Sequence, residues 1–124
     1  TVEAVREVAS AMDKVAVECK TDTPGFIVNR CLFAFMLEAI RCYEDGVATL
    51  EDIDTAIKLG LNHPMGPFEM MDMSGIDTFP HVTETLEALP VTGWSAPRSI
   101  LKLIAEGRYG RKNGHGWYDY SDRG

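Results

Sequence analysis

Hydrophobic side chains recur with helical spacing over residues 23–46, the longest such run in the chain. The run opens with Pro24 and Gly25 and then continues to Gly46 without another helix breaker. When successive residues are placed roughly 100° apart, the apolar side chains form one continuous arc. The pattern predicts a long helix around which the rest of the domain packs. The arc consists of Cys31, Cys42, Phe35, Val28, Ala39, Leu32, Tyr43, Met36, Ile40 and Phe33.

One polar residue, Asn29, falls within this apolar arc, close to the start of the predicted helix. An amide on a buried face costs about 1–3 kcal/mol unless it finds hydrogen-bond partners. Asn29 therefore has either a structural partner or a chemical role. Spacing alone favours the structural interpretation, and at this point both stay open.

Two short patterns precede the long helix. Residues 2–12 place Val2, Val5 and Val8 on one stripe, which predicts an amphipathic helix. Residues 14–20 have the period-two pattern of a short strand. A lone strand has no partner within this chain. Either the segment is irregular, or it pairs across a dimer, or its sheet belongs to a domain outside this chain.

Helical periodicity returns in four shorter segments, whose ends are suggested by local capping residues. Thr49 is the expected N-cap of the first and Gly60 its end, while Asp77 and Ser95 are the expected N-caps of the last two. The four predicted helices cover residues 50–59, 68–73, 77–89 and 95–107.

The remaining segments are predicted to be irregular. Residues 90–94 form a loop after the stop at Pro90, and residues 108–120 form an ordered tail pinned by Tyr109, Trp117 and Tyr118. Together these elements predict an all-α fold, a bundle of about five helices around one long helix, with a short αβ segment at its N-terminus.

Composition fits one soluble domain. The 124 residues are 45% hydrophobic and 25% charged, and no apolar run approaches the roughly 20 residues needed to span a bilayer. No signal peptide opens the chain. Cys31 and Cys42 lie too far apart along one helix to form a disulfide, and free thiols are typical of a reducing compartment. We expect a cytoplasmic protein.

The net charge of −7 argues against nucleic-acid binding, but it is unevenly distributed. Residues 98–124 carry +3, which leaves −10 for residues 1–97. A basic tail on an acidic body is usually a surface that packs against its own body or a sister subunit. A site for an anionic ligand is the other interpretation. Arg111 and Lys112 are its candidate residues, against the simpler view of a solvated loop.

The chain carries no self-sufficient catalytic set. His63, His81 and His115 stand far apart in sequence without metal-ligand spacing, so we expect no metal site. His63, beside Pro64, is best interpreted as a packed turn residue. The tail glycines do not follow the G-x-G-x-x-G pattern of a nucleotide loop, and no G-x-S-x-G elbow is present.

Three sequence blocks, taken together and in this order, resemble the C-terminal domain of the NAD-dependent L-3-hydroxyacyl-CoA dehydrogenases. They are DTPGFIVNR at residues 22–30, LGLNHPMGPFEMMD at residues 59–72 and GRKNGHGWYDY at residues 110–120. The blocks cover nearly the whole chain. The NHPMGP form and the WYDY ending look most like the bacterial 3-hydroxybutyryl-CoA dehydrogenase branch. Residues 78–97 depart from the family pattern, which puts acyl-chain preference in doubt.

The resemblance implies a two-domain, dimeric enzyme of which this chain is a part. An N-terminal Rossmann domain would bind NAD and carry the catalytic histidine, so the isolated chain should be inactive. Residues 1–20 would be the tail end of that domain, and residues 21–124 the helical domain that completes the substrate cleft and forms the homodimer. We expect no membrane partner and no nucleic-acid partner.

The resemblance also assigns a role to Asn29, whose counterpart in the PGFxVNR motif faces the active site. It would hydrogen-bond the acyl-CoA substrate and hold the catalytic histidine in place. Arg111 or Lys112 would contact the CoA phosphates. The intact enzyme would interconvert 3-hydroxyacyl-CoA and 3-ketoacyl-CoA, with a preference for short chains. Two alternatives are a non-catalytic helical dimerisation or binding module, and a dehydrogenase of CoA-free 3-hydroxy acids.

Overall fold

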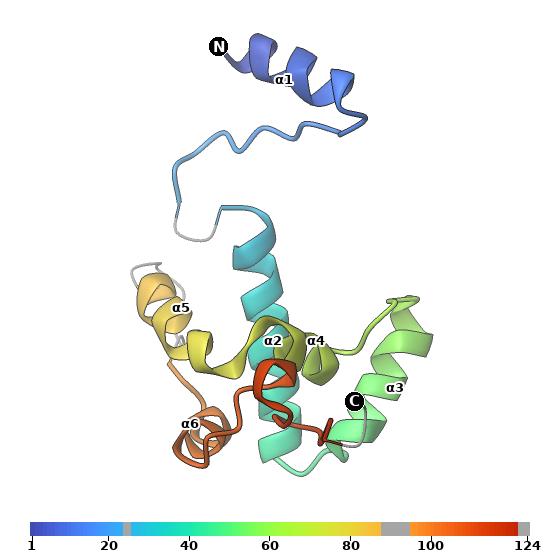
Figure 1. Cartoon of the computed structure of the whole chain (residues 1–124), viewed down its shortest axis with the longest axis vertical. Helices are drawn as coiled ribbons and strands as arrows, with labels where there is room; N and C mark the ends of the chain where they lie inside the picture. The colour runs from blue at the N-terminus through green and yellow to red at the C-terminus, as the bar shows by residue number, and fades with distance from the viewer. Residues whose placement is uncertain (24–25, 88–94, 122–124) are drawn as a thin grey trace.

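The computed structural model describes residues 1–23, 26–87 and 95–121, and this part of the chain is helical. Figure 1 shows α2 running through the middle of the bundle. Helix α1 lies beyond the first turn of α2, and an extended segment connects the two helices. The all-α prediction is confirmed. Each described helix is too short or too polar to span a membrane. The elements are α1 (Val2–Ala11), α2 (Val28–Glu44), α3 (Leu50–Leu61), α4 (Pro67–Ser74), η1 (Ile76–Thr78), α5 (Phe79–Leu86), α6 (Arg98–Ala105) and η2 (Arg111–Asn113).

The long helix α2 packs the domain with its second half. It begins at Val28, and its buried residues are Met36, Leu37, Ala39 and Ile40. Val28 itself is 71% exposed. Gly46 ends the helix as predicted, with a φ of 72° and an N–H that donates to the carbonyl of Tyr43 at 3.1 Å. The first turn of α2 therefore stands clear of the core, while Leu32 and Phe33 in the second turn pack against it.

The N-terminal segment contributes nothing to this core. The predicted helix at residues 2–12 is confirmed as α1, which buries no residue. Residues 14–20, for which the sequence predicts a strand without a partner in this chain, pair with no other described segment and are irregular here. A period-two pattern forms a strand only where another strand supplies its hydrogen bonds, and the described residues offer none.

Local capping signals predict the start of α3 but not its end. Thr49 accepts a hydrogen bond from the N–H of Asp52 at 3.2 Å, as expected of an N-cap. The helix then continues through Gly60 to Leu61 and ends at Asn62, whose φ of 55° lies in the left-handed region. Asparagine tolerates this conformation, so it replaces Gly60 as the terminating residue.

Two later helices receive their N-terminal caps from other helices. The carboxylate of Asp54 on α3 accepts from the N–H groups of Phe68 and Glu69 at 2.8 and 3.2 Å, at the start of α4. The carboxylate of Glu44, at the end of α2, accepts from the N–H and hydroxyl of Ser99 at 2.8 and 2.7 Å, at the start of α6. These contacts fix α4 on α3 and α6 on α2.

The predicted caps Ser95 and Asp77 are therefore wrong. Helix α6 has Pro97 at its N-cap position, and its start is held by Glu44 rather than by Ser95. Asp77 lies within η1 and forms an ion pair with Lys112. The helix predicted for residues 77–89 is observed as η1 followed by α5, and its last two residues, like the predicted loop at 90–94, lie outside the described residues.

The core forms where the second half of α2 meets α4, α6 and the tail. The indole of Trp117 packs edge-on against Phe68 and Tyr43, with ring centroids 4.8 and 5.4 Å apart. Trp117 and Tyr118 thus pin the C-terminal tail to the core, as predicted, whereas Tyr109 is not part of this cluster. The buried cluster comprises Met36, Ala39, Ile40, Ile53, Phe68, Met71, Ile76, Phe79, Ile100, Leu103 and Trp117.

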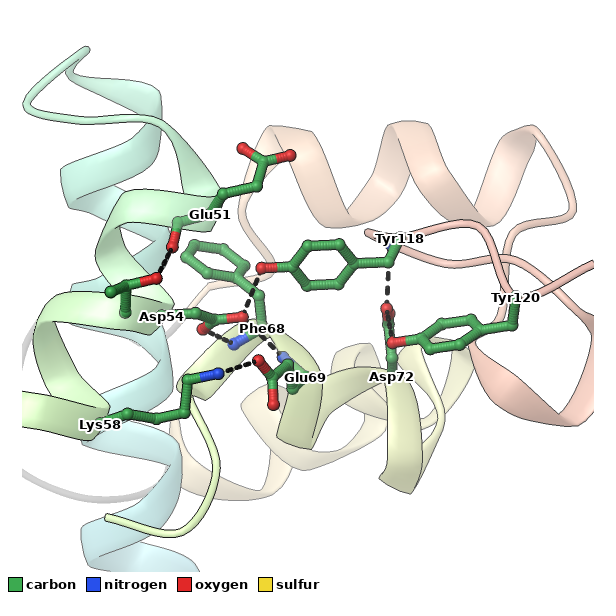
Figure 2. A network of polar contacts seen from close by, with 9 residues as sticks. Glu51, Asp54, Lys58, Phe68, Glu69, Asp72, Tyr118 and Tyr120 are labelled. Atoms are coloured by element: carbon green, nitrogen blue, oxygen red, sulfur yellow. Dashed lines mark hydrogen bonds and ion pairs between the residues drawn. The ribbon is translucent and has the colours of Figure 1, made fainter. Parts of the chain in front are cut away.

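Two buried carboxylates, those of Asp54 and Asp72, hold the tail. We call this pair the tail clamp. Asp72 accepts from the N–H groups of Trp117 and Tyr118 at 2.8 and 3.0 Å and from the hydroxyl of Tyr120 at 2.8 Å. Asp54 accepts from the hydroxyl of Tyr118 at 2.6 Å. Figure 2 shows the two tyrosines reaching the two carboxylates from the same tail segment. Both aspartates are 1% exposed.

Two glycines allow the tail to approach this closely. A Cβ at Gly110 would overlap the backbone carbonyl of Asp72, and one at Gly116 would overlap its carboxylate. Gly110 also has a φ of 113°, which side chains rarely adopt. These glycines are needed for packing within the chain itself.

We expect Asp72→Ala to lower the free energy of unfolding by about 3 kcal/mol, because two buried N–H groups and the Tyr120 hydroxyl lose their acceptor. Urea denaturation followed by circular dichroism measures this change. Asp45→Ala, at an exposed carboxylate on the same domain, is the control and should change stability by less than about 0.5 kcal/mol. Equal stability of the two variants would contradict the role of the tail clamp.

Candidate functional site

Asn29 lies in the first turn of α2, on the part of the helix that stands clear of the core. Its side chain is exposed, and its amide makes no hydrogen bond with the described residues. The interpretation of Asn29 as a satisfied buried amide is therefore wrong for this structure. An amide can both donate and accept, so Asn29 is available to a polar partner outside this bundle.

Asn29 lines a groove whose other walls are apolar. The groove has a volume of about 460 Å³ and lies between the extended segment that follows α1 and the start of α2. Most of its apolar side chains are well exposed, including Val17 at 76% and Val28 at 71%. The lining residues are Val17, Cys19, Phe26, Ile27, Val28 and Asn29.

The turn that leads into the groove is fixed by two contacts with Thr23. The N–H of Phe26 donates to the Thr23 carbonyl at 3.0 Å, and the Arg30 guanidinium donates to the Thr23 hydroxyl at 3.2 Å. These bonds set the direction in which the chain enters α2. They thereby place Phe26, Ile27 and Val28 beside Asn29.

Arg111 and Lys112 do not share this groove. The Lys112 ammonium pairs with Asp77 and lies 5.9 Å from the centroid of the Tyr109 ring, while the Arg111 guanidinium lies 5.6 Å from the centroid of Tyr120. In Figure 1 the tail lies at the lower half of α2, well below the first turn of that helix along the long axis. A contact of Arg111 or Lys112 with CoA phosphates stays a prediction.

The described residues do not form a metal centre or a nucleotide site. Among them, no group of three or more histidine, cysteine or acidic side chains is placed to hold a metal ion. Gly110 and Gly116 pack directly against Asp72. Asp72 therefore fills the space beside these glycines that a pyrophosphate would need. His63 packs edge-on against Phe35 at 5.8 Å, which agrees with its interpretation as a turn residue. Cys19, Cys31 and Cys42 are free thiols.

Sequence reasoning missed the tail clamp, although one signal was present. Asp72 is flanked by Met71 and Met73 in a short apolar helix, where an unpaired carboxylate would be costly. Asp54 lies next to Ile53 on α3 and carries no comparable signal. Its partners Phe68 and Tyr118 are far away in sequence.

Comparison with known proteins decides the family. The sequence matches the family described as 3-hydroxyacyl-CoA dehydrogenase, C-terminal domain, over residues 25–120. The chain belongs to the 3-hydroxyacyl-CoA dehydrogenase family. The matched region begins just before α2 and ends at the tail clamp's last partner, Tyr120.

Relatives within this family are named either hydroxyacyl-coenzyme A dehydrogenase or 3-hydroxybutyryl-CoA dehydrogenase. The human mitochondrial hydroxyacyl-coenzyme A dehydrogenase is 46% identical over 123 residues, which are 97% of this chain and 38% of that protein. The 3-hydroxybutyryl-CoA dehydrogenase of Mycobacterium tuberculosis is 37% identical over 113 residues, 90% of this chain and 39% of that protein. The chain thus spans less than half the length of these dehydrogenases.

The crystal structure of (S)-3-hydroxybutyryl-CoA dehydrogenase from Ralstonia eutropha has the same fold. It matches with a TM-score of 0.86 at 35% identity, over 95% of this chain and 42% of that one. Bacterial 3-hydroxybutyryl-CoA dehydrogenases are therefore among the relatives, as the sequence blocks suggest. Sequence identity is nevertheless higher with the human mitochondrial enzyme.

In this dehydrogenase domain the pKa values of the tail-clamp aspartates and of their tyrosine partners are shifted. Burial raises the pKa of Asp54 and of Asp72, while the hydrogen bonds that each receives act in the opposite direction. Burial and then the hydrogen bond to Asp72 raise the pKa of Tyr120 to about 12, from an ordinary value of 10.0. The pKa of Tyr118 is raised further, by burial and by Asp54.

The raised pKa of Tyr120 predicts how the domain responds to alkali. Because the phenol is easier to ionise in the unfolded chain, its contribution to stability is complete below pH 10.0 and is lost as the pH rises towards about 12. The measurement is the difference in ultraviolet titration between the wild-type chain and Tyr120→Phe, which isolates this phenol. We expect a midpoint near 12 in the folded chain. A midpoint at the ordinary value would contradict the contact with Asp72.

Proposed function

We propose that this chain is the substrate-cleft domain of an NAD-dependent 3-hydroxyacyl-CoA dehydrogenase. The intact protein would interconvert 3-hydroxyacyl-CoA and 3-ketoacyl-CoA, with NAD held by an N-terminal domain. The single observation that supports this best is the exposed amide of Asn29 in an otherwise apolar groove. An unpartnered amide beside open apolar surface suits one half of a cleft that a second domain completes.

Asn29 would act by hydrogen bonding. Its amide can donate to the reacting oxygen or the thioester region of the substrate while its carbonyl accepts from the catalytic histidine. Such contacts hold the substrate and the base in reacting geometry and stabilise charge that develops on the oxygen. The histidines of this chain offer no base at the groove, because none of the three lines it. The base would belong to the N-terminal domain.

The N-terminal residues support a second domain. The apolar stripe of α1 is exposed, with Val5 at 65% and Val8 at 61%, and the segment after it pairs with no other described segment. An amphipathic helix with no buried residue needs a further surface to cover its apolar side. We propose that residues 1–20 pack as the last helix and strand of the Rossmann domain. The family match over residues 25–120 agrees with this division.

The homodimer and the cytoplasmic location belong to this proposal. Exposed apolar surface on α2 and α4 would favour such a dimer, but part of that surface is already buried within the chain. Met36 and Met71 are 1% and 2% exposed within the chain's own core. Met73, 54% exposed, remains available to a sister subunit. A short-chain substrate such as 3-hydroxybutyryl-CoA is proposed from the names of the bacterial relatives.

The role of Asn29 is tested in the full-length protein with Asn29→Ala. We expect kcat/KM for acetoacetyl-CoA reduction by NADH to fall about a hundredfold, because a hydrogen bond to the reacting group is lost. Glu38→Ala, at an exposed position of the same helix, is the matched control and should leave the rate unchanged. If Asn29→Ala leaves kcat/KM within about twofold of wild type, the amide has no part in the cleft.

A further inference from the structure

Phe26 has an unusual backbone conformation at the edge of the groove. Its φ is 49°, in the left-handed region, where a bulky side chain is strained by about 1–2 kcal/mol. Its ring is nevertheless 62% exposed, so burial within this domain does not offset the strain. A strained aromatic residue with an exposed ring is a feature that points to function.

The turn at Phe26 does not itself require an aromatic side chain. The backbone N–H of Phe26 makes the bond to Thr23, and any residue other than proline would supply that donor. Glycine or asparagine would adopt the same φ with less strain. The chain uses asparagine in this way at Asn62, where φ is 55°. The ring of Phe26 is therefore retained for a contact that the turn alone does not explain.

The groove pairs one polar group with a larger apolar surface. Phe26 precedes Asn29 by three positions, and both line the same groove. The walls next to them are Ile27, 43% exposed, and Val28, 71% exposed. An occupant that matches this arrangement is polar at one end and hydrocarbon at the other. The volume of about 460 Å³ is within the usual range for small-molecule sites.

We propose that Phe26 is a specificity-determining residue whose ring supports the hydrocarbon chain of a 3-ketoacyl or 3-hydroxyacyl thioester while Asn29 contacts its oxygen-bearing end. This inference rests on the proposed function and extends it from the reacting group to the acyl chain. The oxygens of such a thioester are confined to one end of the chain. Contact with the ring then grows as the acyl chain lengthens, so Phe26 acts on long substrates more than on short ones.

The test compares two substrates in the full-length protein. The quantity measured is the ratio of kcat/KM for 3-ketooctanoyl-CoA to that for acetoacetyl-CoA. Phe26→Asn suits the left-handed backbone and removes the apolar ring, and we expect it to lower this ratio about tenfold. Phe26→Leu keeps an apolar side chain and should keep the ratio within about twofold of wild type. Val47→Asn, at a 70% exposed position that does not line the groove, is the matched control and should leave the ratio unchanged.

Each other outcome has a defined meaning. An equal fall for both substrates in Phe26→Asn would show that the ring packs against the N-terminal domain or a second copy of the chain, and it would overturn the inference. An unchanged ratio would overturn it as well, while turnover of both substrates would leave the proposed function intact. Failure of the wild-type protein to turn over either thioester would reject the proposed function, and this inference with it.

Discussion

Two carboxylates inside the helical core, Asp54 and Asp72, join segments that are far apart in sequence. Asp54 caps the start of α4 from α3, and Asp72 holds the backbone of the tail on α4. A buried carboxylate is costly unless its oxygens are satisfied, and here each accepts three hydrogen bonds, one from a buried donor and two from partly buried donors. The tail then brings Trp117 against Phe68 and Tyr43, which places the end of α2. The position of the long helix thus depends on the tail clamp.

This arrangement divides α2 into two parts with different tasks. Its second half is buried by α4 and the rest of the core, and it anchors the helix. Its first turn extends beyond the bundle (Figure 1). Asn29 lies on this turn and lines the apolar groove. A helix anchored at one end is a rigid support for a side chain at the other, which suits a cleft that has to be held in register with a second domain. The family match and the open groove therefore both fit the proposed role of this chain as the substrate-cleft domain.

Sequence periodicity predicted the helices because each has a stripe that must be buried. Thr49 and Gly46 were predicted correctly because their partners lie within a few residues along the chain. Ser95 and Asp77 were not, since α6 is capped by Glu44 from another helix and tertiary contacts of this kind leave no local signal. The apolar arc of α2 likewise identified Asn29 but not its exposure. Periodicity shows which face of a helix is apolar and not how much of its length is covered.

The central claim is that this chain holds the substrate half of a dehydrogenase and that another domain supplies the base and the cofactor. The most direct measurement is the rate of NADH oxidation with acetoacetyl-CoA, for the purified chain and for the full-length protein at equal concentration. The account predicts turnover by the full-length protein and none above background by the chain alone. Turnover by the isolated chain would contradict it, because the described residues would then have to contain the base and the cofactor site.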